Sequence, residues 1–167
     1  FNDYLHDMNI VQNFARLNRQ AIAADIIKSL KFTQLTSFSA VHNYIDTENK
    51  ILRKGAISAQ DGETMIIPLN MRDGCLICKG KGNADWNCSA PHGAGRAFNR
   101  TDTVNAFTLS QYKKEMQGIY STSINRDTLD ECPMAYKDSS TIMEQINPTL
   151  EIIEKLTPVY NFKAGAK

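Results

Sequence analysis

The sequence lacks several features, and each absence excludes a class of protein. Its 167 residues contain no apolar run of the roughly 18 residues that a membrane-spanning helix needs, so we expect no membrane partner. Charge of one sign is not in excess, since 19 Lys and Arg face 18 Asp and Glu, for a formal net charge of +1. Any binding of nucleic acid must therefore depend on a local basic patch and not on overall charge.

Cysteine is also scarce. Four cysteines in an otherwise ordinary composition favour free, reduced thiols over a disulfide framework, which predicts a cytoplasmic protein. No signal-peptide pattern is present at Phe1, where the chain already looks helical, so we expect a piece of a longer protein. Repeats, low-complexity segments and interdomain linkers are absent as well, so the length predicts a single domain with a sizeable core.

The pattern of apolar residues predicts a mixed fold. From Asp3 to Leu30 they recur at three- and four-residue spacing, which indicates a long amphipathic helix. Short helices are expected at 108–117 and on both sides of Asn147-Pro148. Strands are expected at 36–41, 51–59, 65–71, 74–79, 119–124 and 158–163. Together these elements predict an α+β fold in which the long N-terminal helix packs on a mostly antiparallel sheet.

Three positions refine the expected strands. Gly55 lies inside a strand pattern and predicts a bulge or a close approach of another group. Asp61-Gly62 is a typical hairpin turn. Pro68 lacks an N–H group, so we expect the chain to leave the ladder there.

One stretch, residues 87–100, concentrates unusual chemistry. Its distinctive members are His92, the small residues Gly93, Ala94 and Gly95, and the arginines Arg96 and Arg100. Glycine allows backbone N–H groups to approach an anion closely, and guanidinium groups match phosphate oxygens. If a helix begins there, the two arginines share a face, and cations at a helix start favour a bound anion. The alternative is a tight turn followed by solvated arginines.

A second histidine stands at the end of a predicted strand. His42 is followed by the amide side chain of Asn43, a pair that can ligate a metal or hold a phosphate. An ordinary packed histidine is the alternative interpretation.

Residue spacing argues against three other kinds of site. The order of Cys75, Cys78, Cys88 and His92 resembles a zinc site, but if 74–79 is a strand its two thiols point to opposite faces. A thioredoxin-like pair would need a helix after Cys78, and none is expected. Serines and aspartates for a Ser/His/Asp hydrolase exist, but no nucleophile elbow does.

Several segments in this order resemble the RtcB family of RNA ligases. They are His42-Asn43-Tyr44, Arg53-Lys-Gly-Ala56, Ile67-Pro68, Ser89-Ala-Pro-His-Gly-Ala-Gly-Arg96, Pro133-Met-Ala-Tyr-Lys137 and Phe162-Lys163. The resemblance covers nearly the whole chain. It implies an enzyme dependent on GTP and Mn²⁺ that joins an RNA 3′-phosphate or 2′,3′-cyclic phosphate to a 5′-hydroxyl, in tRNA splicing or RNA repair. Its partners would then be GTP and RNA, as tRNA halves or broken RNA ends.

The resemblance also implies roles for individual residues. His92 would be the nucleophile that takes GMP from GTP, and His42 would bind Mn²⁺. Tyr136 would lie against the guanine ring, with Lys163 at its edge, and Arg96 and Arg100 would meet RNA phosphate. The remaining residues expected at the nucleotide are Asn43, Pro68, Leu69, Asn70, Met71, Cys75, Gly93, Ala94 and Gly95.

The chain departs from the family pattern in two respects. Pro68-Leu-Asn-Met-Arg72 stands where most members have Pro-Gly-Ser-Met-Gly, and Cys75 replaces a serine, which indicates a divergent branch. The family's other metal ligands, an Asp, a Cys and two His, have no counterpart here, nor has its Gly-Asn-His-Phe motif. We therefore expect residues 1–167 to be the C-terminal portion of such a ligase, inactive alone. The alternative is a noncatalytic RNA- or nucleotide-binding module.

Overall fold

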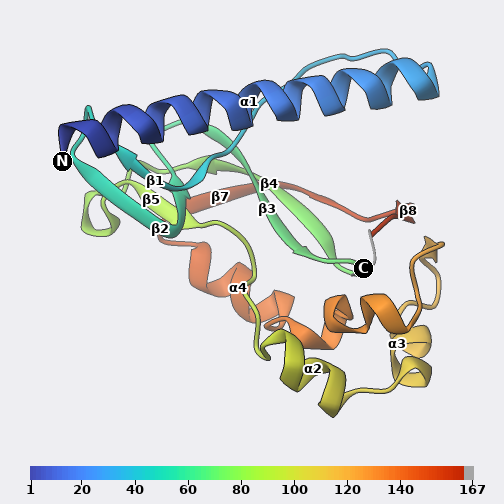
Figure 1. The fold of residues 1–167 in the computed structure, drawn as a ribbon. Helices are drawn as coiled ribbons and strands as arrows, with labels where there is room; N and C mark the ends of the chain where they lie inside the picture. The colour runs from blue at the N-terminus through green and yellow to red at the C-terminus, as the bar shows by residue number, and fades with distance from the viewer. Residues whose placement is uncertain (164–167) are drawn as a thin grey trace. The chain divides into compact units, whose positions relative to one another are not determined.

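The computed structural model describes residues 1–163 and divides the chain into two compact units, Phe1–Phe38 and the part from Ser39 onward. The first unit contains helix α1 (Asn2–Leu30), the blue ribbon of Figure 1, as the apolar spacing predicts. The helix ends at Lys31, whose left-handed backbone lets its N–H donate to the carbonyls of Ile27 and Lys28. No helix within the described residues is long and apolar enough to cross a membrane.

The second unit contains three small sheets. In the first, β2 (Ile51–Ser58) lies between β1 (His42–Asp46) and β5 (Ser89–Pro91). In the second, β4 (Gly74–Gly80) lies between β3 (Thr64–Asn70) and β7 (Leu150–Leu156). These four pairings are antiparallel, whereas β6 (Tyr120–Ser121) and β8 (Tyr160–Asn161) pair in parallel. The predicted α+β class with mostly antiparallel strands is confirmed.

Short helices fill the rest of the second unit. The α-helices are α2 (Arg100–Ala106), α3 (Leu109–Glu115) and α4 (Ser139–Ile146), and the 3-10 turns are η1 (Ala84–Trp86), η2 (Arg126–Glu131) and η3 (Pro133–Ala135). The expected start of α3 is confirmed, since Thr108 and Gln111 form a capping box there. Figure 1 shows α2 and α3 on the side of the unit away from β1 and β2, whereas α4 packs in the same apolar cluster as Ile57 of β2.

Several predicted strands are wrong or shorter than expected. Residues 36–41 form no strand, because the ladder with β2 begins only at His42. Only two residues of 119–124 and two of 158–163 pair, as β6 and β8. The helix expected after Pro148 is the strand β7, where pairing with β4 overrides the local preference.

The predictions for the Asp61-Gly62 turn and for Pro68 also need correction. Asp61-Gly62 does form a turn, but the flanking strands β2 and β3 belong to different sheets, so no hairpin results. Pro68 stays in β3 and pairs with Cys75, with an irregularity in register only after it. Because β3 is an edge strand, the missing N–H of proline removes no ladder bond.

Two apolar clusters stabilise the unit. One joins the strands to α4 through residues that include Ile57, Ile67, Leu76 and Ile146. The other lies under α3, η2 and η3, and consists of Met71, Tyr112, Met116, Leu129, Cys132 and Ala135. Met71, at the end of β3, connects the strands to the second cluster, because Tyr112 donates a hydrogen bond to its sulfur at 3.0 Å.

Candidate active site

A cavity of about 680 Å³ lies among β3, β4, the loop that follows β5, and the chain around β8. It brings together most of the residues that the sequence singles out. Those lining it are Pro68, Leu69, Asn70, Met71, Cys75, His92, Gly93, Ala94, Gly95, Arg96, Tyr136 and Lys163. His42, Asn43 and Arg100 are not among the lining residues. Residues far apart in sequence thus share one cavity large enough for a nucleotide.

Backbone contacts fix the loop from His92 to Arg96, here called the histidine loop. Ala94 donates its N–H to the Pro68 carbonyl at 3.0 Å. A Cβ at Gly93 would lie 2.9 Å from that same oxygen, so only glycine fits there. Gly95 has a left-handed φ of 70°. Within residues 1–163 the N–H groups of Gly93 and Gly95 donate to no acceptor, which leaves them available to a ligand anion.

The helix expected directly after the glycines begins later. Asn99 caps α2, whose first residue is Arg100, by accepting a hydrogen bond from the N–H of Asp102 at 2.8 Å. Arg96 therefore lies outside the helix, and the prediction that Arg96 and Arg100 share a helical face is wrong. Both arginines instead contact Asp130 and Glu131 of η2.

The imidazole of His92 is held in one tautomer. Its Nδ1 lies 2.7 Å from the carbonyl oxygen of Gly55 in β2. Since a carbonyl only accepts, Nδ1 carries the proton and Nε2 keeps a free lone pair. The His92 backbone N–H donates to the same oxygen at 3.2 Å. The contact of its carbonyl with the His92 ring is the close approach predicted at Gly55, which also adopts a left-handed φ of 65°.

His42 lies next to His92. The two ring centroids are 5.0 Å apart, with the ring planes inclined by 34°. Asn43, with a left-handed φ of 58°, forms a bulge in β1, and its Oδ1 accepts the Gly55 N–H at 2.5 Å. Asn43 therefore supports Gly55 and stands away from the cavity lining.

Apart from the neighbouring rings of His42 and His92, the described part of the chain brings no set of metal-ligating side chains together. No group of three or more His, Cys, Asp or Glu among the described residues is placed to hold a metal ion. In β4, Cys78 is fully buried in the apolar core while Cys75 faces the cavity, as the strand geometry predicts. All four cysteines are free. A manganese site at His42 would need further ligands from outside the described residues.

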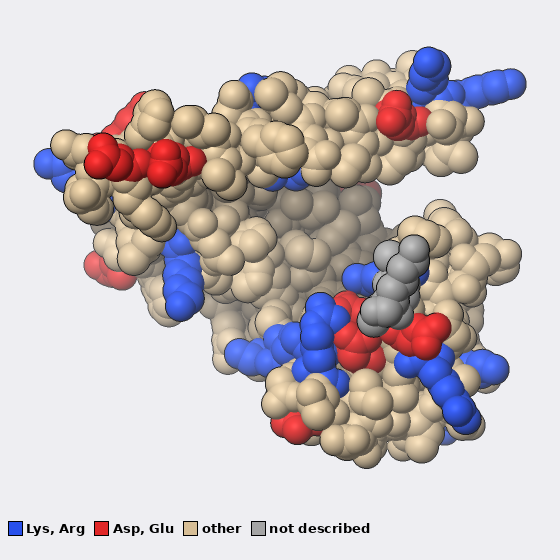
Figure 2. Space-filling view, viewed as in Figure 1, with Lys and Arg blue, Asp and Glu red and all other residues tan. Residues whose placement is uncertain are grey.

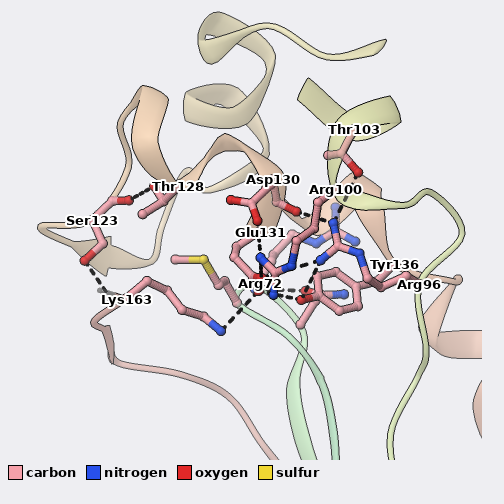
Figure 3. A network of polar contacts seen from close by, with 12 residues as sticks. Arg72, Arg96, Arg100, Thr103, Ser123, Thr128, Asp130, Glu131, Tyr136 and Lys163 are labelled. Carbon is pink, nitrogen blue, oxygen red and sulfur yellow. Dashed lines mark hydrogen bonds and ion pairs between the residues drawn. The ribbon is translucent and has the colours of Figure 1, made fainter. Parts of the chain in front are cut away.

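Sequence reasoning missed the acidic centre of the site, Glu131, which Figure 3 shows among the cationic side chains. Tyr136 donates its hydroxyl to Oε2 of Glu131 at 2.6 Å, and Nζ of Lys163 lies 3.4 Å from the same oxygen. The other oxygen, Oε1, lies 2.8 Å from Arg100 and 3.5 Å from Arg96. The only signal in the sequence was the Asp130-Glu131 pair preceding the Cys132-Pro133 segment.

The surroundings shift the pKa values of this cluster. Burial, followed by the hydrogen bond to Glu131, raises the pKa of Tyr136 to about 12. For Glu131 burial is the largest single effect and acts upward, but the Tyr136 hydrogen bond and the charges of Lys163 and Arg100 outweigh it and lower the pKa. The carboxylate is therefore charged and the phenol neutral at neutral pH.

Of the three cations in this cluster, Asp130 contacts only the two arginines. Its carboxylate pairs with Arg100, and its backbone carbonyl accepts a hydrogen bond from Arg96 at 2.5 Å. The Arg96 guanidinium also lies over the Tyr136 ring, 5.2 Å from its centroid. Figure 2 shows the result near α2 and α3, where acidic side chains are flanked by basic ones. Three cations face two carboxylates, so the cluster keeps an excess of positive charge.

Comparison with known proteins identifies relatives of this chain. The family described as "tRNA-splicing ligase RtcB" matches residues 1–164. The chain is 32% identical to the RNA-splicing ligase RtcB of Escherichia coli K12, over 95% of this chain and 43% of that protein. It is 30% identical to RtcB2 of Escherichia coli strain ATCC 25922, over 98% of this chain and 47% of the relative.

A more distant relative gives the same result. The tRNA-splicing ligase RtcB of Aeropyrum pernix is 31% identical over 85% of this chain and 37% of its own length. The chain thus spans less than half the length of the curated relatives it matches. On the evidence of the family match across its described length, the chain belongs to the RtcB family of tRNA-splicing ligases.

Proposed function

We propose that this chain is the C-terminal portion of the catalytic domain of a GTP-dependent RNA ligase, with His92 as the residue that carries GMP. The observation that supports the proposal most is the hydrogen bond between His92 Nδ1 and the Gly55 carbonyl, at 2.7 Å, on the wall of the cavity. This bond leaves Nε2 as the free nucleophilic atom. The RNA ends joined would be a 3′-phosphate or 2′,3′-cyclic phosphate and a 5′-hydroxyl.

The first step of the proposed reaction uses the free lone pair that this tautomer leaves on Nε2 of His92. Nε2 attacks the α-phosphorus of GTP, a P–N bond forms, the bond to the bridging oxygen breaks, and pyrophosphate leaves. The ring then bears positive charge, which the Gly55 carbonyl stabilises through the Nδ1 proton. When an RNA 3′-phosphate attacks the same phosphorus, the P–N bond breaks and neutral imidazole leaves. A 5′-hydroxyl then displaces GMP and joins the RNA ends.

The rest of the cavity fits a guanine nucleotide. Backbone N–H groups at Gly93 and Gly95 are available to phosphate oxygens next to His92. Tyr136 offers a ring for the base, and Lys163 offers a cation for a carbonyl oxygen on its edge. Arg96 and Arg100 would meet RNA phosphate by exchanging their carboxylate partners for it.

The described residues do not build a metal site by themselves. His42 would supply one ligand to Mn²⁺, and the closeness of its ring to His92 is what supports that role.

Covalent labelling tests the proposal. A longer protein containing this chain, or the chain complemented by the upstream half of a relative, is incubated with Mn²⁺ and GTP labelled at the α-phosphate. We expect label on His92 that acid removes and alkali does not, since phosphoramidates have that lability. His92→Ala should abolish the label. His6→Ala, which changes an exposed histidine of α1, should retain it.

The outcome also separates the two candidate functions. GTP binding without covalent label in the complemented protein would favour a noncatalytic nucleotide-binding module and overturn the ligase proposal. Label that persists in His92→Ala would place the nucleophile elsewhere.

A further inference from the structure

One carboxylate connects the two halves of the proposed site. Oε2 of Glu131 contacts Tyr136 and Lys163, the two side chains proposed to meet the base. Oε1 contacts Arg100 and Arg96, which are proposed to meet phosphate. The Glu131 side chain is only 14% exposed, whereas that of Lys163 is 40% exposed. The more exposed cation is thus held by a largely covered anion that four side chains contact.

We propose that Glu131 is a positioning residue for nucleotide selection: its carboxylate orients Lys163 and Tyr136 so that the cavity accepts guanine and rejects adenine. Glu131 does not need to contact the base, since its oxygens are occupied by protein donors. The inference depends on the proposed function, because it assumes that a guanine nucleotide binds in this cavity.

The physical basis is the direction of hydrogen bonding. An ammonium group only donates, so Lys163 at the base edge is compatible with the carbonyl oxygen of guanine and not with the amino group of adenine. Lysine is flexible, and it discriminates only if its position is fixed. Within the described residues the ion pair with Glu131 is the contact that fixes Nζ, while the Lys163 backbone N–H is held by Ser123 Oγ at 2.9 Å.

The same carboxylate fixes Tyr136. The 2.6 Å hydrogen bond from its hydroxyl fixes the position of the outer end of the ring, and the Arg96 guanidinium lies over one face. Loss of the Glu131 charge would free both base-contacting groups at once. It would also leave Arg96, Arg100 and Lys163 with one anion fewer, so attraction for phosphate should rise or stay the same.

These opposite effects define the experiment. Binding of GTP, ATP and inorganic triphosphate to the 167-residue chain is measured by titration calorimetry without metal. We expect Glu131→Gln to lower the preference for GTP over ATP by about tenfold, which is what a misplaced polar contact costs. Binding of inorganic triphosphate should not weaken. A purely structural defect would weaken all three ligands together.

The neighbouring carboxylate provides the matched control. Asp130→Asn also removes an anion from Arg100, but Asp130 does not contact Tyr136 or Lys163. It should therefore leave the preference for GTP unchanged. Lys163→Met, at a half-exposed side chain that should tolerate truncation, should lower the preference as Glu131→Gln does. Combining Lys163→Met with Glu131→Gln should lower it little further.

Three results would overturn the inference: full GTP preference in Glu131→Gln, equal loss in Asp130→Asn, or parallel loss of inorganic triphosphate binding. In each of these the wild-type chain still prefers GTP, so the proposed function survives. A wild-type chain that binds neither nucleotide would contradict the proposed nucleotide site itself.

Discussion

At the scale of single residues, Gly55 determines how His92 is presented. Its carbonyl accepts from His92 Nδ1, its N–H donates to Asn43, and its φ of 65° is one that side chains rarely adopt. Glycine is thus required in β2 by backbone conformation more than by space, since an added Cβ would lie no closer than 3.7 Å to His92.

We therefore expect Gly55→Ala to lower the free energy of unfolding by about 1 to 2 kcal/mol, because alanine is strained at this φ. Any shift of the Gly55 carbonyl misplaces His92, so labelling of His92 by GTP should slow roughly tenfold or more. Chemical denaturation and the rate of labelling measure the two effects. Gly62→Ala is the control, since Gly62 has a φ of 72° in a turn with nothing within 4 Å. It should lose stability but label normally.

Single residues of the site differ most in how far the sequence predicts them. The histidine loop was found because its members are adjacent in the chain and chemically unusual together. The role of Glu131 could not be predicted because no local sequence pattern connects it with its partners. Two of these lie 31 and 35 residues before it, one lies 5 residues after it and one lies 32 residues after it, namely Arg100, Arg96, Tyr136 and Lys163. The prediction that Arg96 and Arg100 share a helical face is wrong because the helix, capped by Asn99, begins at Arg100 and leaves Arg96 outside it.

At the scale of elements, a partly buried ion pair holds β1 against β2. The Arg53 side chain has no exposed surface and lies 2.8 Å from Asp46, while its Nε donates to Ser89 Oγ of β5 at 3.0 Å. One arginine therefore connects all three strands of the sheet that presents His42 and Gly55. The hydrogen bond from the Asn49 backbone N–H, and then that from Arg53, lowers the pKa of Asp46 to about 2.

This pair predicts how stability depends on pH. The pKa of Asp46 is lower in the folded chain than the ordinary value of 3.8, so its contribution is complete above about pH 4 and is lost as pH falls toward 2. Denaturation midpoints at pH 5 and pH 3 should therefore differ more for wild type than for Asp46→Asn. If the midpoint falls equally in wild type and in Asp46→Asn, Asp46 does not contribute to the loss of stability at low pH.

Element prediction succeeded where periodicity was long and failed where pairing decided the outcome. Helix α1 and strands β2, β3 and β4 follow from their own apolar patterns. Strand β7 does not, because Leu150–Leu156 takes the extended form by pairing with β4, whose paired residues lie 70 to 81 positions earlier in the chain. The strand expected at 36–41 is the converse case, a suitable composition without a partner strand.

At the scale of the whole molecule, the second unit contains the cavity proposed to bind a nucleotide but, among its described residues, no complete metal site. Of the expected metal ligands only His42 is present, and the described residues contain no group of three that could hold an ion. We therefore expect this chain to be the nucleotide-binding part of the proposed ligase, with the remaining metal ligands contributed by another part of the protein.

We expect the 167-residue chain alone to join no RNA ends in the presence of GTP and Mn²⁺. Complementation with the upstream half of a relative should restore joining, because the missing ligands return with it. Gel electrophoresis of an end-labelled RNA with a 3′-phosphate and a 5′-hydroxyl measures the product. Joined RNA from the unassisted chain would refute the expectation.

The parallel pairing of β6 with β8 has a consequence for biosynthesis. It brings Asn161 to the end of β3, where its amide donates to the Met71 carbonyl at 2.6 Å, and Lys163 to Glu131. One wall of the cavity therefore comes from residues 158–163, which are translated after every other segment that lines it. If the cavity binds GTP as proposed, a nascent chain should retain the nucleotide only once this wall has folded, and bound GTP should stabilise the wall in turn.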